Sequence, residues 1–139
     1  MTSERLFIDT SAFYALEDAS DEHHDEALAI QRWCRWHRPL LFTSHHVLDE
    51  SVTLIGGRLR PDRAVRFAKG LLASRVIQIV RTDEALEQAA LNVYARLNDG
   101  RVSFTDCVSF AIMRAIDIPA AFGFDRHFER AGFRRVTPP

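Results

Sequence analysis

The chain has 139 residues, a length that fits one compact domain over residues 1–139. Hydrophobic residues make up 47% of it, which excludes an intrinsically disordered chain. The 18 basic and 19 acidic residues nearly cancel, to a formal net charge of −1, and this balance argues against a protein that binds nucleic acid through bulk positive charge.

Short apolar runs alternate with helical patterns along the first half of the chain. The runs at residues 6–8 and 40–42 predict buried strands. A short helix is predicted over residues 12–16, with Thr10 and Ser11 as its capping residues. Three longer helices are predicted: one after the acidic segment 18–26, ended by Arg38-Pro39; one from Ser44 to Gly56-Gly57; and one over residues 62–73, opened by Pro61.

The second half continues the alternation. The β-branched run at residues 76–80 predicts a strand, and shorter strands are predicted at 120–122 and 133–136. Helices are predicted over residues 82–97, 104–116 and 126–130. This order predicts an α/β fold, a three-layer α/β/α sandwich with a central, mainly parallel sheet of four to five strands.

The cysteines and the N-terminus favour a cytoplasmic protein. Cys34 and Cys107 each lie in an apolar stretch, which predicts two buried thiols in a reducing compartment rather than a disulfide. The first five residues lead directly into a strand-like run and have no apolar segment typical of a signal peptide. No apolar run approaches the ~20 residues that a membrane span requires.

Four carboxylates lie where such a fold gathers functional groups. Asp9 directly follows the first predicted strand, and Asp125 follows the strand at 120–122 with two residues between. Glu50 lies in the second turn of the helix after Ser44, and Asp106 lies in the first turn of the helix at 104–116. Because ligands bind at the carboxyl ends of the strands in open α/β sheets, we expect these four side chains on one rim.

Such a cluster requires a counter-charge, because like charges at close range raise one another's pKa. Mg²⁺ and Mn²⁺ are hard cations that prefer oxygen ligands, and in phosphate chemistry they activate water and clamp the attacking and leaving oxygens. The pattern therefore indicates metal-dependent phosphodiester cleavage, with Asp9, Asp106 and Asp125 as ligands. Glu50 is expected as a further ligand or as a base that positions water. The chain has no Gly-rich phosphate loop or dinucleotide fingerprint, which disfavours nucleotide-binding functions.

Each carboxylate also has a structural explanation. Asp106 completes a capping-box-like run that begins at Ser103. Asp125 is a candidate cap for the short helix that follows it, and Glu50 is a candidate for the solvated flank of an amphipathic helix. Asp9 has the weakest structural explanation, since an acid directly after a buried strand contributes nothing to packing.

Four short motifs, in this order, resemble those of PIN domains, and the resemblance covers essentially the whole chain. They are Leu6-Phe7-Ile8-Asp9-Thr10-Ser11-Ala12-Phe13, Val47-Leu48-Asp49-Glu50, Ser103-Phe104-Thr105-Asp106-Cys107 and Phe124-Asp125-Arg126-His127-Phe128. The resemblance implies a ribonuclease that cleaves single-stranded RNA with Mg²⁺ or Mn²⁺. Small one-domain members are typically VapC-like toxins, which form homodimers and are held inactive by a cognate antitoxin protein.

By motif matching, the resemblance implies that Asp9, Glu50, Asp106 and Asp125 form the acidic quartet, with Asp9 and Asp106 as the firmest ligands. Ser11 or Thr10 would orient Asp9 through a hydroxyl group. Ser103 would be the hydroxyl residue three positions before the third acid.

Two positions depart from the family pattern. Gly123 stands two residues before the fourth acid, where the family often has Thr or Ser. Asp49 adjoins Glu50, so either is a candidate for the second acid. Side chains of successive helical residues point about 100° apart, so only one of the two faces the site.

Basic residues gather around the helix at 62–73. Arg63, Arg66 and Lys69 are spaced by three and share one helix face, with Arg60 just before them. This face either follows an RNA backbone or is simply solvated, and we favour the solvated face. His127 is a candidate for a phosphate contact or for a structural role on its short helix.

Several histidines suggest a transition-metal site. They occur in His23-His24-Asp25, His45-His46 and Cys34-x-x-His37. Their spacings match no standard zinc pattern, which favours surface or capping histidines. The aromatic residues Phe13, Tyr14, Trp33 and Trp36 are expected in the core or at a protein interface rather than as platforms for stacking bases.

Two other functions remain open. An aspartyl-nucleophile phosphatase also has an Asp after its first strand, but it requires a second acid two residues later, where this chain has Ser11, and a lysine near the site. The lone Lys69 lies in the basic helix. The other alternative is a PIN-like module that binds RNA or protein without cleavage, and the presence of all four acids favours catalysis over it.

Overall fold

The structure is a computed structural model that describes residues 4–139. The expectation that the chain has no signal peptide depends on its first five residues and falls mainly outside the described residues. Five strands and seven helices occur in the described part of the chain, in the order β1 (Arg5–Ile8), α1 (Thr10–Glu17), α2 (His24–His37), β2 (Leu40–Ser44), α3 (His45–Arg58), α4 (Pro61–Ala73), β3 (Ile77–Val80), α5 (Glu84–Leu97), α6 (Phe104–Ala115), β4 (Ala120–Phe122), α7 (His127–Arg130) and β5 (Arg134–Arg135).

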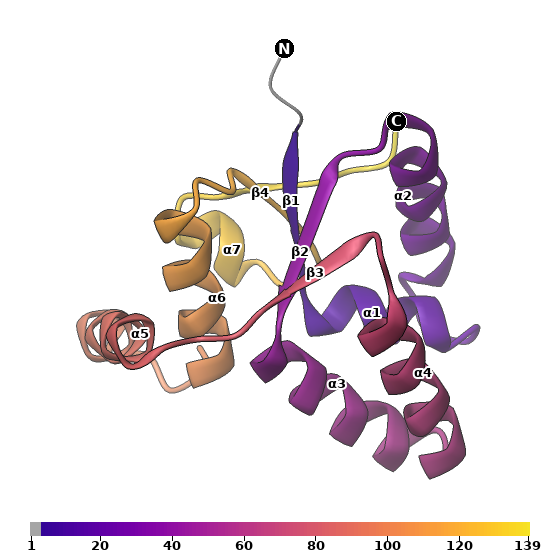
Figure 1. Cartoon of the computed structure of the whole chain (residues 1–139), viewed down its shortest axis with the longest axis horizontal. Coiled ribbons are helices and arrows are strands. Elements are labelled where there is room, and N and C mark those ends of the chain that lie inside the picture. The colour runs from indigo at the N-terminus through magenta and orange to yellow at the C-terminus, as the bar shows by residue number, and fades with distance from the viewer. Residues whose placement is uncertain (1–3) are drawn as a thin grey trace.

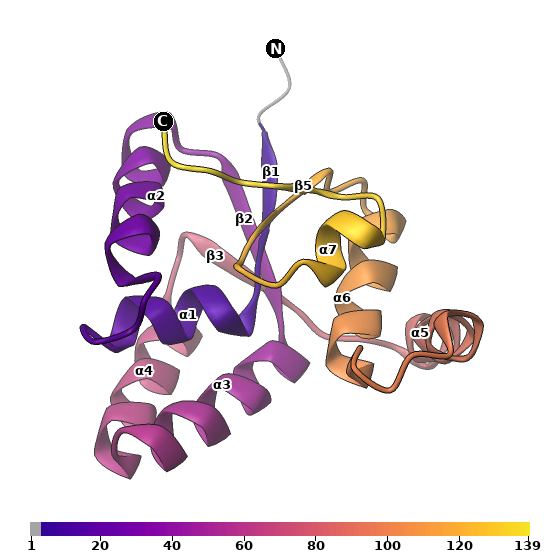
Figure 2. The same ribbon diagram turned by 180° about the vertical axis from the view of Figure 1, so that it is seen from behind.

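The five strands form one sheet in the order β3-β2-β1-β4-β5, and each neighbouring pair is parallel (Figure 1). Helices α1 to α4 cover one face of this sheet and helices α5 to α7 cover the other (Figures 1 and 2). The predicted three-layer α/β/α sandwich is confirmed.

The centre of the sheet is apolar because helices cover both of its faces. Leu6 and Phe7 of β1 and Ala120 and Ala121 of β4 are all 0% exposed. Two alanines favour a strand only weakly, and β4 forms because it pairs with β1 on one side and β5 on the other.

The chain leaves β1 and β4 in opposite directions across the sheet. From β1 it passes through α1 and α2 to β2, whereas from β4 it passes through α7, on the opposite face, to β5 (Figures 1 and 2). The Asp9 amide donates to the Phe122 carbonyl oxygen over 3.0 Å, so these two strands end side by side. Ligands bind at such a switch point, where the connections part.

Some predicted boundaries are wrong, and capping explains the difference. Helix α1 begins at Thr10 rather than at residue 12, because Asp9 is its N-cap and accepts the Ser11 amide, in place of capping by Thr10 or Ser11. Helix α5 begins after Asp83 for the same reason, rather than at Thr82.

The two cysteines are free and buried, as predicted. Burial raises the pKa of the Cys34 thiol to about 11 and also raises that of Cys107, so both thiols stay protonated. Phe13 and Tyr14 are buried, whereas Trp36 is 85% exposed. Within residues 4–139, no helix has the length and apolar character needed to cross a membrane.

Candidate functional site

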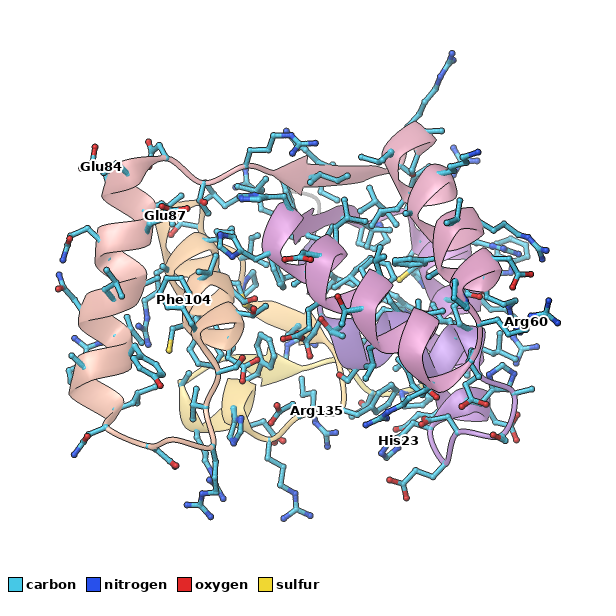
Figure 3. All side chains as sticks on the ribbon, turned by 90° about the horizontal axis from the view of Figure 1, so that it is seen from below. His23, Arg60, Glu84, Glu87, Phe104 and Arg135 are labelled. Carbon is cyan, nitrogen blue, oxygen red and sulfur yellow. The ribbon has the colours of Figure 1, made fainter. Side chains whose placement is uncertain are left out.

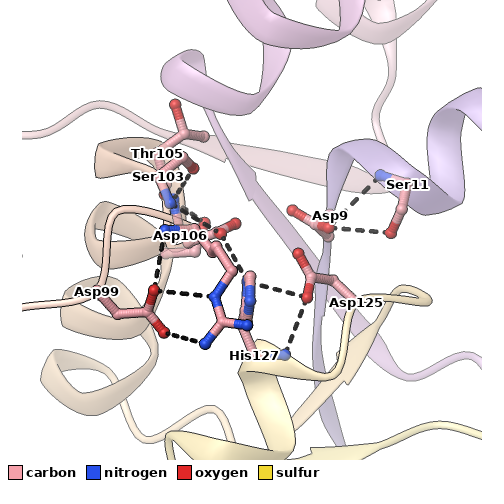
Figure 4. A network of polar contacts seen from close by, with 10 residues as sticks. Asp9, Ser11, Asp99, Ser103, Thr105, Asp106, Asp125 and His127 are labelled. Atoms are coloured by element: carbon pink, nitrogen blue, oxygen red, sulfur yellow. Dashed lines mark hydrogen bonds and ion pairs between the residues drawn. The ribbon is translucent and has the colours of Figure 1, made fainter. Parts of the chain in front are cut away.

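The structure brings the four predicted carboxylates together at the carboxyl edge of the sheet. Asp9 caps α1 directly after β1, and Asp125 lies in the connection from β4 to α7. Glu50 extends from α3, and Asp106 extends from the first turn of α6. The charges of Asp106 and Glu50 both raise the pKa of Asp9, which requires that the groups lie close to one another. Figure 4 shows Asp9, Asp106 and Asp125 around one space.

Asp9 is the most buried of these carboxylates, at 3% exposed. Its Oδ2 atom accepts the Ser11 hydroxyl over 3.0 Å, whereas its buried Oδ1 atom has no hydrogen-bond partner. Burial, followed by the charge of Asp106, raises the pKa of Asp9 to about 7. A buried carboxylate with one unpaired oxygen is stabilised by a nearby cation.

Asp106 combines two functions that the sequence presented as alternatives. Its amide donates to the Ser103 hydroxyl oxygen over 3.0 Å, and its Oδ2 atom accepts the Ser103 amide over 3.3 Å, so the capping box at the start of α6 is complete. Burial, followed by the charge of Asp125, raises the pKa of Asp106. The capping residue is therefore also a member of the acidic cluster.

His127 lies between two of the carboxylates (Figure 4). Its Nδ1 atom is 3.0 Å from Asp125 Oδ1 and 3.4 Å from Asp106 Oδ2. Its amide also donates to Asp125 Oδ1 over 2.9 Å, which fixes Asp125 at the start of α7. One ligand atom from each of these three residues lies within 4.8 Å of the others. His127 thus contacts the acidic cluster itself.

Glu50, rather than Asp49, acts on the cluster. The charge of Glu50 raises the pKa of both Asp9 and Asp106, and Asp49 is exposed. Beside Glu50 lies an open pocket of about 360 Å³, which His46 and Thr105 also line. This space leaves room for a substrate beside Glu50, and Asp49 also lines it.

Gly123 has a steric reason to be glycine. A Cβ atom at this position would lie 3.0 Å from Asp9 Cβ and 3.1 Å from Ser11 Oγ. The next amide, of Phe124, donates to the Ser11 hydroxyl oxygen over 2.9 Å. Ser11 therefore joins Asp9 to the connection that carries Asp125, whereas the Thr10 hydroxyl is buried without a partner.

The basic residues near α4 are not brought to the acidic cluster. The Arg60 side chain pairs with Asp62 over 2.8 Å, and the Arg63 guanidinium donates to the Glu17 carbonyl oxygen at the end of α1. Figure 3 shows Arg60 on the opposite side of the molecule from Phe104, which begins α6. Arg66 lines a separate, largely apolar cavity of about 550 Å³. A role for these residues and for Lys69 in RNA binding remains a prediction.

Asp99 is a further acid beside the cluster that the sequence did not single out. Its carboxylate pairs with the Arg101 side chain over 3.2 Å, and Figure 4 shows Asp99 and His127 in one polar network. The Arg101 hydrogen bond, with a smaller contribution from His127, lowers the pKa of Asp99. The sequence signal at this position, Asn98-Asp99-Gly100, predicts only a turn.

The donor set fits a hard divalent cation. Carboxylate oxygens are the ligands that Mg²⁺ and Mn²⁺ prefer, and the unpaired Oδ1 atom of Asp9 is available to such an ion. Ser11, Ser103 and His127 hold the neighbouring carboxylate atoms, as outer partners do in metal sites. The residues present can therefore hold at least one divalent cation.

Comparisons with protein families and with individual proteins indicate the same family. Residues 6–134 match the PIN domain family. The chain is 36% identical over 133 residues to the 23S rRNA-specific endonuclease VapC20 of Mycobacterium tuberculosis, covering 96% of this chain and 98% of the relative. It is 33% identical over 115 residues to a VapC ribonuclease of Archaeoglobus fulgidus, covering 80% of this chain and 71% of that protein.

Solved structures agree with these relatives. The crystal structure of Mycobacterium tuberculosis VapC20, described as a sarcin-ricin loop cleaving toxin, superposes with a TM-score of 0.86 at 35% identity, covering 96% of this chain and 99% of that one. The DNA-bound VapBC of Salmonella typhimurium shares the fold, with a TM-score of 0.69 at 17% identity over 96% of this chain and 97% of that one. The chain belongs to the PIN domain family and, within it, is similar to the VapC ribonucleases.

Proposed function

We propose that this protein is a metal-dependent endoribonuclease that cleaves single-stranded RNA, and that it is the toxin of a toxin–antitoxin pair. The observation that carries the proposal is the buried, unpaired Oδ1 atom of Asp9, within range of the charges of Asp106 and Glu50 at the switch point of the sheet. A buried, unpaired carboxylate oxygen raises the free energy of the folded protein unless a cation is bound. The relative that is 36% identical is an endonuclease, which also supports the proposal.

In this proposal Asp9, Asp106 and Asp125 are the ligands of Mg²⁺ or Mn²⁺. When bound, the ion neutralises the carboxylates and stabilises the negative charge that develops on the phosphate during cleavage. Ser11 and Ser103 hold Asp9 and Asp106 in position by the hydrogen bonds described above. Glu50 completes the site as a ligand or as the base that accepts a proton from the attacking water, since its carboxylate borders the open pocket.

Ribosomal RNA is the first substrate to test. The relative that matches over almost its whole length is named a 23S rRNA-specific endonuclease, and its crystal structure is that of a sarcin-ricin loop cleaving toxin. We expect the protein to cut 23S rRNA at one site, mapped by primer extension after incubation with ribosomes. Cleavage of other RNAs with 23S rRNA left intact would reject this substrate and leave the nuclease assignment standing.

The toxin assignment also predicts the location, the oligomeric state and a protein partner. We propose a cytoplasmic homodimer that a cognate antitoxin protein holds inactive. Size-exclusion chromatography with light scattering measures the oligomeric state. A short neighbouring reading frame that encodes a DNA-binding protein, and whose co-expression abolishes growth arrest, would support the antitoxin.

The test of catalysis compares the parent with Asp9→Asn on a single-stranded RNA in Mg²⁺ or Mn²⁺. We expect the variant to cleave more than about 100-fold more slowly, as for removal of other groups that stabilise a transition state. Asp117→Asn removes one carboxylate from an exposed position and serves as the matched control, with an unchanged rate expected. Equal rates in the parent and Asp9→Asn would contradict the site. RNA binding without cleavage in the parent would favour the non-catalytic module, and release of phosphate from a monoester would favour the phosphatase.

A further inference from the structure

A second group of metal-ligating side chains lies outside the acidic cluster. His45 and His46 begin α3, and Glu87 lies in the first turn of α5. One ligand atom from each of the three lies within 4.8 Å of the others, and all three side chains are partly buried. We propose that His45, His46 and Glu87 bind a Zn²⁺ ion at a site separate from the acidic cluster, although His46 also lines the pocket beside Glu50.

The contacts of His45 and Glu87 resemble those of metal ligands, whereas His46 Nε2 lies 3.4 Å from the Thr82 hydroxyl oxygen as well as near Glu87. The Nδ1 atom of His45 lies 3.5 Å from the Val80 carbonyl oxygen, and the tautomer that donates a weak hydrogen bond there leaves Nε2 free to bind a metal. Histidines that bind metals usually donate their other ring N–H to a carbonyl or carboxylate oxygen in this way. The Thr82 hydroxyl donates to Glu87 Oε1 over 3.0 Å and orients the carboxylate.

The chemistry of the three groups and the separation of one pair among them fit zinc. His46 Nε2 lies 3.6 Å from Glu87 Oε1. Ligand atoms of a tetrahedral zinc ion lie about 3.3 Å apart, given bond lengths of about 2.0 Å, so this pair is already near the required separation. Two imidazoles and one carboxylate form a zinc donor set that leaves one position for water. Mg²⁺ has no preference for imidazole nitrogen, so the two sites differ in the ions that they select.

The ion would join segments that the sheet topology already brings close together. His46 packs edge-on against Phe104, with ring centroids 6.0 Å apart, and this contact fixes one side of the site. Figure 3 shows Glu87 on the side of α5 that faces α6, whereas Glu84 lies at the outer end of the helix. The spacing of the histidines along the chain did not reveal the site because its third ligand comes from a separate helix. A bound ion would cross-link the start of α3 to the start of α5.

The test is a Zn²⁺ titration of the metal-stripped protein by calorimetry, carried out in the Asp106→Asn background so that the acidic cluster does not contribute a second site. We expect one zinc equivalent, which both His46→Ala and Glu87→Gln weaken by more than about 10-fold. His37→Ala removes an exposed histidine that stacks on Trp33 and bonds to its carbonyl oxygen, and it should leave the zinc equivalent intact. Co²⁺ in place of Zn²⁺ should give the visible absorption of a tetrahedral ion.

Each other outcome overturns the proposal. These outcomes are no zinc equivalent in the Asp106→Asn background, an equivalent that survives both substitutions, or an equivalent that His37→Ala also removes. Circular dichroism checks that the variants are folded. If His46→Ala unfolds because it loses the Phe104 contact, Glu87→Gln still decides, since that side chain is 46% exposed and its replacement leaves α5 intact.

Discussion

Substitution of Asp9 by asparagine should stabilise the metal-free protein at neutral and alkaline pH. In the folded chain, burial and the charge of Asp106 raise the pKa of Asp9 from 3.8 to about 7. The folded state therefore binds a proton at Asp9 more tightly than the unfolded state, and the free energy of unfolding falls as the pH rises between these two values. Asparagine carries no charge and is also a good N-cap residue, so the variant keeps the start of α1 without this loss.

The size of the effect follows from the shift. Each pKa unit corresponds to about 1.4 kcal/mol, so the rise from 3.8 to about 7 sets an upper limit of about 4 kcal/mol on the stability lost by the parent. The Ser11 hydroxyl donates to an oxygen of either side chain, which leaves the loss of charge as the main difference between the two proteins. Below the unfolded pKa the difference should vanish.

Urea unfolding of both proteins in a chelator, at about pH 4 and about pH 8, measures the effect. We expect the stability advantage of Asp9→Asn to be large at about pH 8 and small at about pH 4, which lies just above the unfolded pKa of 3.8. Added Mn²⁺ should stabilise the parent and have a much smaller effect on the variant, because the parent loses its charge repulsion on binding the ion. An Asp9→Asn variant that is no more stable than the parent at about pH 8 in chelator would refute the reasoning.

Three further substitutions test the support of the site, each by urea unfolding. Gly123→Ala forces a Cβ atom to 3.0 Å from Asp9 Cβ and should cost about 1–3 kcal/mol, whereas Gly57→Ala meets nothing within 4 Å and should not destabilise the chain. Ser11→Ala removes a partner from both Asp9 and the Phe124 amide and should cost about 1–3 kcal/mol; a neutral result would mean that this hydroxyl does not join the two segments. Ser103→Ala breaks the capping box of α6 and should lower the free energy of unfolding by about 1 kcal/mol. An unchanged free energy of unfolding would contradict this prediction.

Most of the fold was predictable because local and global signals agree. The apolar runs mark the strands whose faces helices cover, and their alternation with helices predicted a parallel sheet. The strand order β3-β2-β1-β4-β5 was not predicted from the sequence. The predicted start of α1 was wrong because Asp9, interpreted only as a functional acid, also caps the helix. Capping and membership of the acidic cluster were interpreted as alternatives, whereas Asp9 and Asp106 both cap a helix and lie in the cluster.

The rest of the site depends on tertiary contacts that no local pattern contains. A phosphate contact or a structural role was expected for His127, and its position between Asp106 and Asp125 was not, because that position depends on the packing of α7 beside α6. The reason for glycine at position 123 is the approach of the β4–α7 connection to Asp9. The candidate zinc site also depends on a tertiary contact, because Glu87 of α5 lies beside His45 and His46 at the start of α3.

The most direct test of the central claim is the rate of cleavage of one single-stranded RNA as a function of Mg²⁺ or Mn²⁺ concentration. It should be measured for the parent, Asp117→Asn and the four single variants Asp9→Asn, Glu50→Gln, Asp106→Asn and Asp125→Asn. We predict no cleavage in a chelator, saturable activation of the parent and the Asp117→Asn control by the ion, and loss of that activation in each of the four variants. Cleavage that is independent of divalent ions, or that survives in Asp9→Asn or in Asp106→Asn, would contradict the account.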